Sequence, residues 1–448
     1  MSDLPRAPRP RTDAPLLFIG FNEVNFEFVE AYVKRGELPA FGRLFAAHGF
    51  ERTTSEQRYE ELEPWIQWVT AHTGMSFGKH GVFRLGDIVK HDLPQIWEQL
   101  EAQGFSVGAV SPMNAKMRLR APAFFLPDPW TPTDIVAPPI LRRLFAAVAH
   151  IVNENATGDY GWRSLVDVAL GMARVASPGH YPRYVAYAAR ALRESWFKPI
   201  FLDLLLTDVF THCVRRTRPH FASLFLNAGA HIQHHYMFSS PCYRGELRNP
   251  TWYIAPGKDP LLDVYRLYDR VLGDLQASFP RSRLVLATGL HQDPHPEVTF
   301  YWRLREHGEF LRRIGVPFRS VEPRMSRDFV LVCADAAEAG VAARRLTAAR
   351  DEAGEPLFEV DNRGTDLFVM LTYPREIRSA TRFLVENDHY DDLYRHTAFV
   401  AIKNGQHNGV GYFADTGVRR ARDPLGDEVF PLREIPARII AALSTASG

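Results

Sequence analysis

Three short apolar segments constrain the fold of this chain more than any other feature of its sequence. They lie at residues 16–20, 221–226 and 283–288. Continuous apolar runs of this length are typical of strands buried on both faces, as in a parallel sheet covered by helices. Helical patterns at 96–103 and 263–277 alternate with these strands. The sequence therefore predicts an α/β fold, a three-layer α/β/α sandwich with a mostly parallel central sheet.

The segments between these strands predict a leader and two insertions. Residues 1–13 are rich in proline and arginine, which is typical of a loose leader. Helical patterns with little strand character predict a mostly helical insertion at 116–220. Short strands around a helix predict a small α+β cap insertion of the βαβ type at 321–399. The core then comprises residues 14–115, 221–320 and 400–448.

Composition excludes several classes of protein. The 53 Lys and Arg residues nearly balance the 52 Asp and Glu residues, whereas a dedicated nucleic-acid binder needs a basic surplus or stripe. No segment approaches 18 uninterrupted apolar residues, so no membrane span is expected. Cys213, Cys242 and Cys333 are too few and too scattered for a disulfide framework, which predicts a reducing, cytoplasmic location. The oligomeric state stays open.

Histidine and amide side chains follow the predicted strands at the points where the strands end. The residues concerned are Asn22, Asn227, His231, His234, His235, His291 and His407. Because the carboxyl ends of parallel strands meet at one edge of a sheet, these side chains can converge there. Two or three imidazoles with an amide oxygen could hold one zinc-like ion. We interpret His234 and His235 as structural, because adjacent helical residues do not both face one site.

Several fragments occur in the order and at the spacing of a known family. They are residues 16–22, 36–44, 64–74, 80–81, 226–231, 285–292, 407–409 and 435–439. Together they resemble the alkaline phosphatase superfamily, and they are most similar to its type I phosphodiesterase/nucleotide pyrophosphatase branch. The resemblance covers most of the chain and implies the same α/β/α sandwich.

The resemblance also implies where the two metal sites and the nucleophile of the family would fall. The positions for one metal are Asn227, His231 and His407. The positions for the other are Asn22, Leu290, His291 and a nucleophile slot near Glu61 to Glu63. All three expected histidines are present, whereas every expected Asp is replaced. The nucleophile slot contains no Ser or Thr.

Loss of these carboxylates changes how much positive charge the site can hold. A two-metal site places about four positive charges within ~4 Å and needs carboxylates to neutralise them. Without them, two divalent cations would repel strongly at low dielectric. The resemblance therefore implies at most one zinc-like divalent ion, on Asn227, His231 and His407, and no other cofactor. The alternative is that no metal binds and the imidazoles act as acids, bases or hydrogen-bond donors.

The function that these features predict is an atypical phosphoesterase-like hydrolase without a Ser or Thr nucleophile. Its substrate would be a small phosphate- or sulfate-type ester, of the carbohydrate or nucleotide kind. Glu23, Glu63 and His291 are the candidates for activating water, and Asn22 and Arg84 could contact the substrate. Two alternatives stay open: a catalytically degenerate relative that binds a ligand or partner, and a lyase or transferase that reuses the pocket.

Overall fold

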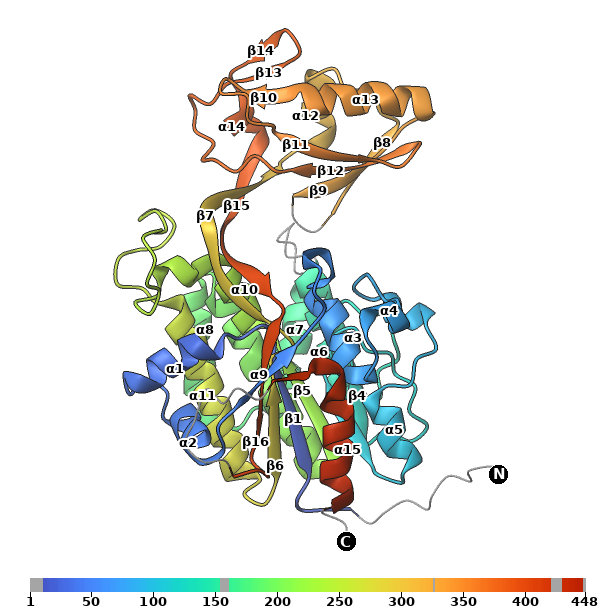
Figure 1. Ribbon diagram of the computed structural model, residues 1–448, viewed down its shortest axis with the longest axis vertical. Helices are drawn as coiled ribbons and strands as arrows, with labels where there is room; N and C mark the ends of the chain where they lie inside the picture. The colour runs from blue at the N-terminus through green and yellow to red at the C-terminus, as the bar shows by residue number, and fades with distance from the viewer. Residues whose placement is uncertain (1–10, 154–160, 325–326, 420–428, 446–448) are drawn as a thin grey trace. The chain divides into compact units, whose positions relative to one another are not determined.

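The computed structural model describes residues 11–153, 161–324, 327–419 and 429–445 (Figure 1). Most of the predicted leader therefore lies outside the described residues. The chain divides into two compact units. The larger unit comprises residues 1–244, 256–294 and 405–448, and the smaller comprises 245–255 and 295–404.

The larger unit is built on an eight-stranded sheet. Its strands, in spatial order, are β17 (Val429–Pro431), β2 (Glu51–Thr54), β16 (Val410–Asp415), β6 (Arg283–Ala287), β1 (Leu16–Phe21), β5 (Phe221–Leu226), β3 (Val107–Val110) and β4 (Phe124–Leu126). Only β16 runs antiparallel to its neighbours β2 and β6; the other adjacent pairs are parallel. The predicted mostly parallel sheet is confirmed.

Helices cover both faces of this sheet. Alternate strand residues point to opposite sides, and in β1 and β5 the residues on both sides are buried. Phe18 of β1 lies 6.3 Å from Trp68 on one face, measured between ring centroids. Phe21 stacks on Tyr268 on the other face at 4.5 Å. The first face carries α3 (Pro64–Thr73), α4 (Phe77–His80), α5 (Ile96–Ala102) and α15 (Ile435–Thr445). The second carries α1 (Phe26–Lys34), α2 (Pro39–His48), α10 (Ala228–Tyr236) and α11 (Pro260–Ser278) (Figure 1). The three-layer α/β/α sandwich is thus confirmed.

The described part of the predicted helical insertion contains four helices. They are α6 (Pro139–Asn153), α7 (Trp162–Val175), α8 (Tyr181–Ala191) and α9 (Phe197–Thr217). α6 packs on α7, and α8 packs on α9. α9 itself packs against β5 and β3, so it belongs to the layer that covers the sheet. The boundaries of the insertion stay a prediction.

The smaller unit has its own sheets and its own apolar core. One sheet contains β8 (Ser320–Pro323), β9 (Asp328–Val332), β11 (Phe358–Asn362) and β12 (Asp366–Leu371), and the other contains β10 (Ala349–Asp351), β13 (Phe383–Val385) and β14 (Asp388–Tyr390). Its helices are α12 (His307–Arg313), α13 (Ala336–Ala348) and α14 (Leu393–His396). Two further strands, β7 (His291–Leu304) and β15 (Thr397–Asn408), pair with each other and belong in part to each unit.

The pairing in the smaller unit corrects the βαβ expectation. β9 and β12 flank α13 in sequence, but they pair antiparallel, whereas a βαβ unit joins parallel strands. The reason is β11, which precedes β12 and forms an antiparallel hairpin with it. β11 has only two apolar residues, Phe358 and Val360, among exposed polar ones, so its alternating pattern is too short to reveal a strand.

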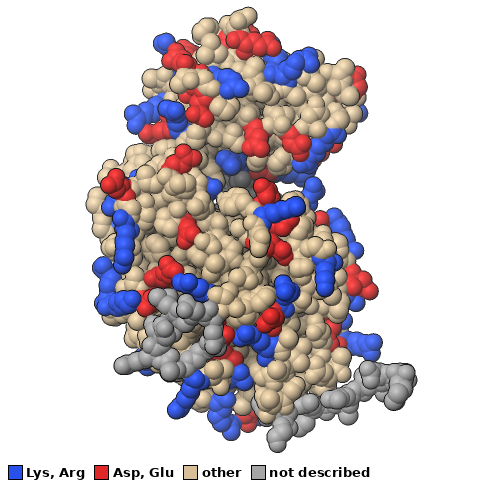
Figure 2. All heavy atoms as spheres, viewed as in Figure 1, with Lys and Arg blue, Asp and Glu red and all other residues tan. Residues whose placement is uncertain are grey.

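On the face drawn in Figure 2, basic and acidic side chains are interspersed on both units, and neither sign of charge forms a large patch. Among the helices of the described residues, none combines the length and the apolar character that crossing a membrane requires.

Candidate metal centre at the carboxyl ends of the strands

The turn that follows β1 presents a buried carboxylate at the edge of the sheet. Glu23 is 2% exposed and has a φ of 58°, in the left-handed region that residues with a Cβ rarely adopt. Both neighbouring strands hold this turn. The Asn22 N–H donates to the Leu226 carbonyl and the Glu23 N–H to the Thr288 carbonyl, each at 3.0 Å. Strained backbone of this kind clusters at functional sites.

A buried aspartate fixes the start of α10, the helix that follows β5. Asp203 of α9 accepts hydrogen bonds from the N–H groups of Ala228 at 2.8 Å and Asn227 at 3.3 Å. The Tyr268 hydroxyl donates to the same carboxylate at 2.8 Å. Burial raises the pKa of Asp203 to about 7, although these hydrogen bonds oppose the shift. The position of α10, and of the histidines on it, is therefore set by contacts with α9 and α11.

Three side chains from distant parts of the sequence meet above this edge. Glu23 Oε2 lies 3.1 Å from His234 Nε2 and 3.1 Å from His407 Nε2. The two imidazole nitrogens are 3.3 Å apart. Burial alone would raise the pKa of Glu23, but His407 and His234 hold it well below its usual range. The carboxylate is therefore ionised at neutral pH.

These three atoms have the spacing of ligands to one metal ion. Zinc binds nitrogen and oxygen at about 2.0–2.1 Å in a tetrahedral arrangement, so adjacent ligand atoms lie about 3.3–3.4 Å apart. The observed separations of 3.1, 3.1 and 3.3 Å are close to that value. Two imidazoles and one carboxylate are also a set that occurs in catalytic zinc sites, where a fourth position stays open. Within the described residues, no second group of His, Cys, Asp and Glu has this proximity. The donors therefore fit one ion rather than two.

Amide side chains hold the Glu23 carboxylate and backbone in place. Gln292 Nε2 donates to Glu23 Oε2 at 2.5 Å and to the Ala230 carbonyl at 3.0 Å. Gln233 Nε2 donates to the Glu23 carbonyl at 2.6 Å. Hydrogen bonds of this kind orient the side chains that bind the ion in metal sites.

A tryptophan sets the orientation of the Asn22 amide. Trp68 Nε1 donates to Asn22 Oδ1 at 2.7 Å. Because an indole N–H can only donate, the amide nitrogen of Asn22 must point the other way. It donates to Glu23 Oε1 at 3.0 Å and to Asn227 Oδ1 at 2.7 Å. Asn22 and Asn227 therefore lie together, and the hydrogen bond of Asn22 to Glu23 connects them to the metal group, which consists of Glu23, His234 and His407.

The other nitrogen of His407 faces Glu63. Glu63 Oε2 lies 3.9 Å from His407 Nδ1, and the Glu63 side chain is 34% exposed. Glu63 directly precedes α3, whose first residue is Pro64. This distance is that of an ion pair and is longer than a hydrogen bond. The structure thus brings Glu63, Glu23 and His407 together.

Of the other expected residues, two histidines and one arginine lie outside the metal group. His231 is exposed, and its ring lies 5.1 Å from that of His235, one helical turn along α10. His291 Nδ1 lies 2.5 Å from the Val410 carbonyl, and its Nε2 lies 3.1 Å from Asp293 Oδ1, so oxygen acceptors face both ring nitrogens. Arg84 is exposed, and no contact among the described residues joins its side chain to the group.

Sequence reasoning missed His234, Gln233, Gln292 and Asp203. Helical spacing could not single out His234, because His231 neighbours both His234, three residues on, and His235, four residues on, on the surface of α10. The contact that distinguishes His234 is the one of its Nε2 with Glu23 Oε2, at 3.1 Å. Two adjacent histidines need not face the same site for one of them to be a ligand.

Comparisons with known proteins give matches among solved structures only. No family model matches the chain, and no curated protein matches it. It is similar to phosphonoacetate hydrolase from Sinorhizobium meliloti 1021 in complex with phosphonoacetate, with 12% identity over 97% of each chain and a TM-score of 0.43. It is also similar to murine ectonucleotide pyrophosphatase/phosphodiesterase 5, with 10% identity, 96% and 95% coverage and a TM-score of 0.43. At these values the likeness decides nothing about the site, whose chemistry rests on its own residues.

Proposed function

We propose that this chain is a hydrolase of small phosphate- or sulfate-type esters that uses one divalent ion held by Glu23, His234 and His407. The observation that carries the proposal is the triangle of ligand atoms, with sides of 3.1, 3.1 and 3.3 Å. A zinc-like ion bound there supplies Lewis-acid polarisation of the ester and activation of water. One carboxylate and two neutral imidazoles leave a divalent ion with a net positive charge, which favours an anionic substrate.

The chain's own residues support this chemistry by holding the ligands still. Asn22 and Gln292 each donate to one oxygen of the Glu23 carboxylate, so this carboxylate keeps one orientation. Glu63 Oε2 lies 3.9 Å from His407 Nδ1, the nitrogen that does not face Glu23. In this proposal Glu63 is a positioning residue. The ester class rests on the motif resemblance. The nucleophile slot near Glu61 to Glu63 holds no Ser or Thr, which favours direct attack by water over a covalent intermediate.

Metal analysis of matched histidine variants tests the site. We expect one zinc per wild-type chain after reconstitution, and less than about a tenth of that in His234→Ala and His407→Ala, because each loses a ligand. His235→Ala is the matched control, since it removes the neighbouring imidazole of the same helix and should keep the metal. Two ions per chain, or a loss in His235→Ala equal to that in His234→Ala, would contradict the assignment.

A substrate panel tests the activity separately. Phosphomonoesters, phosphodiesters and sulfate esters should be compared on zinc-loaded wild type and on His234→Ala. We expect turnover of at least one class by the wild type only. Zinc binding without turnover of any ester would support the degenerate, ligand-binding alternative, which the replaced carboxylates and the missing nucleophile favour.

A further inference from the structure

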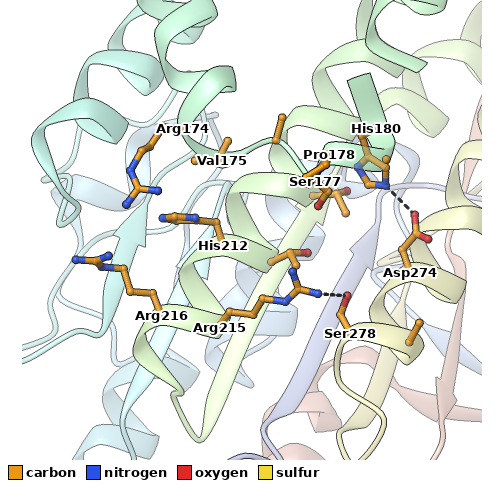
Figure 3. A pocket seen from close by; sticks show the side chains of 15 residues that line it. Arg174, Val175, Ser177, Pro178, His180, His212, Arg215, Arg216, Asp274 and Ser278 are labelled. Atoms are coloured by element: carbon orange, nitrogen blue, oxygen red, sulfur yellow. Dashed lines mark hydrogen bonds and ion pairs between the residues drawn. The ribbon is translucent and has the colours of Figure 1, made fainter. Parts of the chain in front are cut away.

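A cavity lies between the helices of the larger unit. Its volume is about 670 Å³, within the range of small-molecule sites. The wall is formed by the end of α7, the short 3-10 helix Pro178–His180, the second half of α9 and the end of α11 (Figure 3). His212 of this wall is nine residues beyond Asp203 on α9, which corresponds to about 13 Å along the helix axis. The cavity is therefore distinct from the metal centre, which Asp203 supports.

The cavity wall concentrates positive charge. Arg174, Arg215 and Arg216 all line it, and Asp274 is the only carboxylate among the described residues that do so. Figure 3 shows His212 between Arg174 and Arg216. Within the described residues, no ion pair engages any of these three guanidinium groups, although Arg215 donates to Ser278 Oγ at 2.9 Å.

Asp274 on the cavity wall and the adjacent Asp208 are balanced by one histidine and one arginine. His180 lies between Asp208, 2.9 Å from its Nδ1, and Asp274, 3.1 Å from its Nε2. Hydrogen bonds to Asp208 and Asp274 raise the pKa of His180 to about 9, so its ring is charged at neutral pH. Asp274 also lies 3.4 Å from Arg183. The three arginines therefore keep their positive charge unbalanced.

His212 can add a neutral hydrogen-bond donor or acceptor to this wall. Burial lowers its pKa, and the charges of Arg174 and Arg216 lower it further. The ring is thus uncharged at neutral pH and lies beside the two guanidinium groups. A site with several guanidinium groups and a neutral imidazole suits a tetrahedral anion. Each guanidinium can donate two parallel hydrogen bonds to the oxygens of the anion.

We propose that this cavity is a binding site for a phosphate group, formed by Arg174, Arg215, Arg216 and His212 and separate from the metal centre. The phosphate could be free in solution or belong to a lipid headgroup. The reason to consider a lipid is α7, which ends at the cavity. Its apolar side chains Trp162, Leu165 and Leu170 are 71, 55 and 49% exposed. The proposal does not depend on the hydrolase function.

The test is titration calorimetry with inorganic phosphate on full-length His234→Ala protein, in which a weakened metal centre contributes little to binding. We expect saturable binding that weakens as salt rises. In the same background, Arg174→Gln with Arg216→Gln should weaken it at least tenfold, whereas Arg120→Gln, an exposed arginine outside the cavity wall, should leave it unchanged. Absence of phosphate binding, or equal affinity in the cavity variant and the control, would overturn the proposal.

A second measurement does not depend on calorimetric signal. Phenylglyoxal modification followed by mass spectrometry should show phosphate protecting Arg174 and Arg216 but not Arg120. Equal modification with and without phosphate would count against the site. Vesicles then distinguish the sources: binding to phosphatidylglycerol but not phosphatidylcholine vesicles, lost in Arg174→Gln with Arg216→Gln, assigns a lipid headgroup. Phosphate binding without vesicle binding assigns a free phosphorylated ligand.

Discussion

At the scale of single residues, Glu23 contributes the one carboxylate among the three side chains of the candidate metal centre. Asn22 stands directly before it and is held by Trp68, so the amide serves the carboxylate rather than an ion. The left-handed backbone at Glu23 places this side chain between His234 and His407. In the proposed site, one divalent ion would therefore have Glu23 as its carboxylate ligand.

Glu23→Gln should lower zinc affinity by at least about 100-fold. An amide at this position loses the charge that attracts the cation, and its nitrogen would meet the donating Nε2 of Gln292, 2.5 Å from the present oxygen. Competition with a chelating dye measures the effect. Glu63→Gln is the control. It keeps all three proposed ligands, so its zinc affinity should fall only about tenfold, as when a residue that contacts a metal ligand is changed. Wild-type affinity in Glu23→Gln would show that the carboxylate is not a ligand.

The sequence predicted part of this site because strand ends are visible in it. Asn22, Glu23, Asn227 and His407 were found from the apolar runs before them and from motif order. His234 and Gln292 were not, because their roles depend on which way a helix face or strand face turns. That orientation is set by contacts such as Asp203 with the Ala228 N–H, which no local pattern reveals.

At the scale of elements, burial on both faces explains which strands and helices could be predicted. β1, β5 and most of β6 are buried, and their continuous apolar runs are evident in the sequence. β7 is half exposed and contains polar residues over much of its length. α9 is buried on nearly every side and includes Asp203, Thr207 and Asp208, so it has no amphipathic rhythm to detect.

The junction of α7, α9 and α11 should give the protein a pH-dependent stability through His180. Its folded pKa of about 9 lies above the unfolded value of about 6.5. Its stabilising contribution is therefore complete below pH 6.5 and is lost as pH rises through 9. We expect His180→Gln to reduce the free energy of unfolding by about 3 kcal/mol at pH 6 and by much less at pH 10.

Urea denaturation of wild type and His180→Gln across this range measures the difference. His389→Gln, an exposed histidine on β14, serves as the control and should follow the wild type at every pH. If the free energies of unfolding of wild type and His180→Gln differ by the same amount from pH 6 to 10, packing, and not the charge on His180, stabilises this junction.

At the scale of the whole molecule, the chain has two separate cores, and the smaller one extends beyond the cap insertion predicted at 321–399. The smaller unit includes the range 321–399 and extends beyond it, and it also takes in residues 245–255. Trp252 of that segment lies 5.0 Å from Phe399 and 6.3 Å from Phe300, measured between ring centroids. Aromatic contacts between segments so distant in sequence leave no local pattern, so the boundary could not be predicted.

Separate cores predict separate responses to a core mutation. Phe310 is fully buried in the smaller unit, with its ring 6.0 Å from those of Phe358 and Phe383. Phe310→Ala should destabilise that unit by about 3–5 kcal/mol and leave zinc stoichiometry unchanged, because the three proposed ligands belong to the larger unit. Leu224→Ala, in buried strand β5, is the reciprocal variant and should weaken zinc retention. Hydrogen exchange followed by mass spectrometry resolves the units. Equal loss of protection in both units of Phe310→Ala would show that the chain unfolds as one cooperative body.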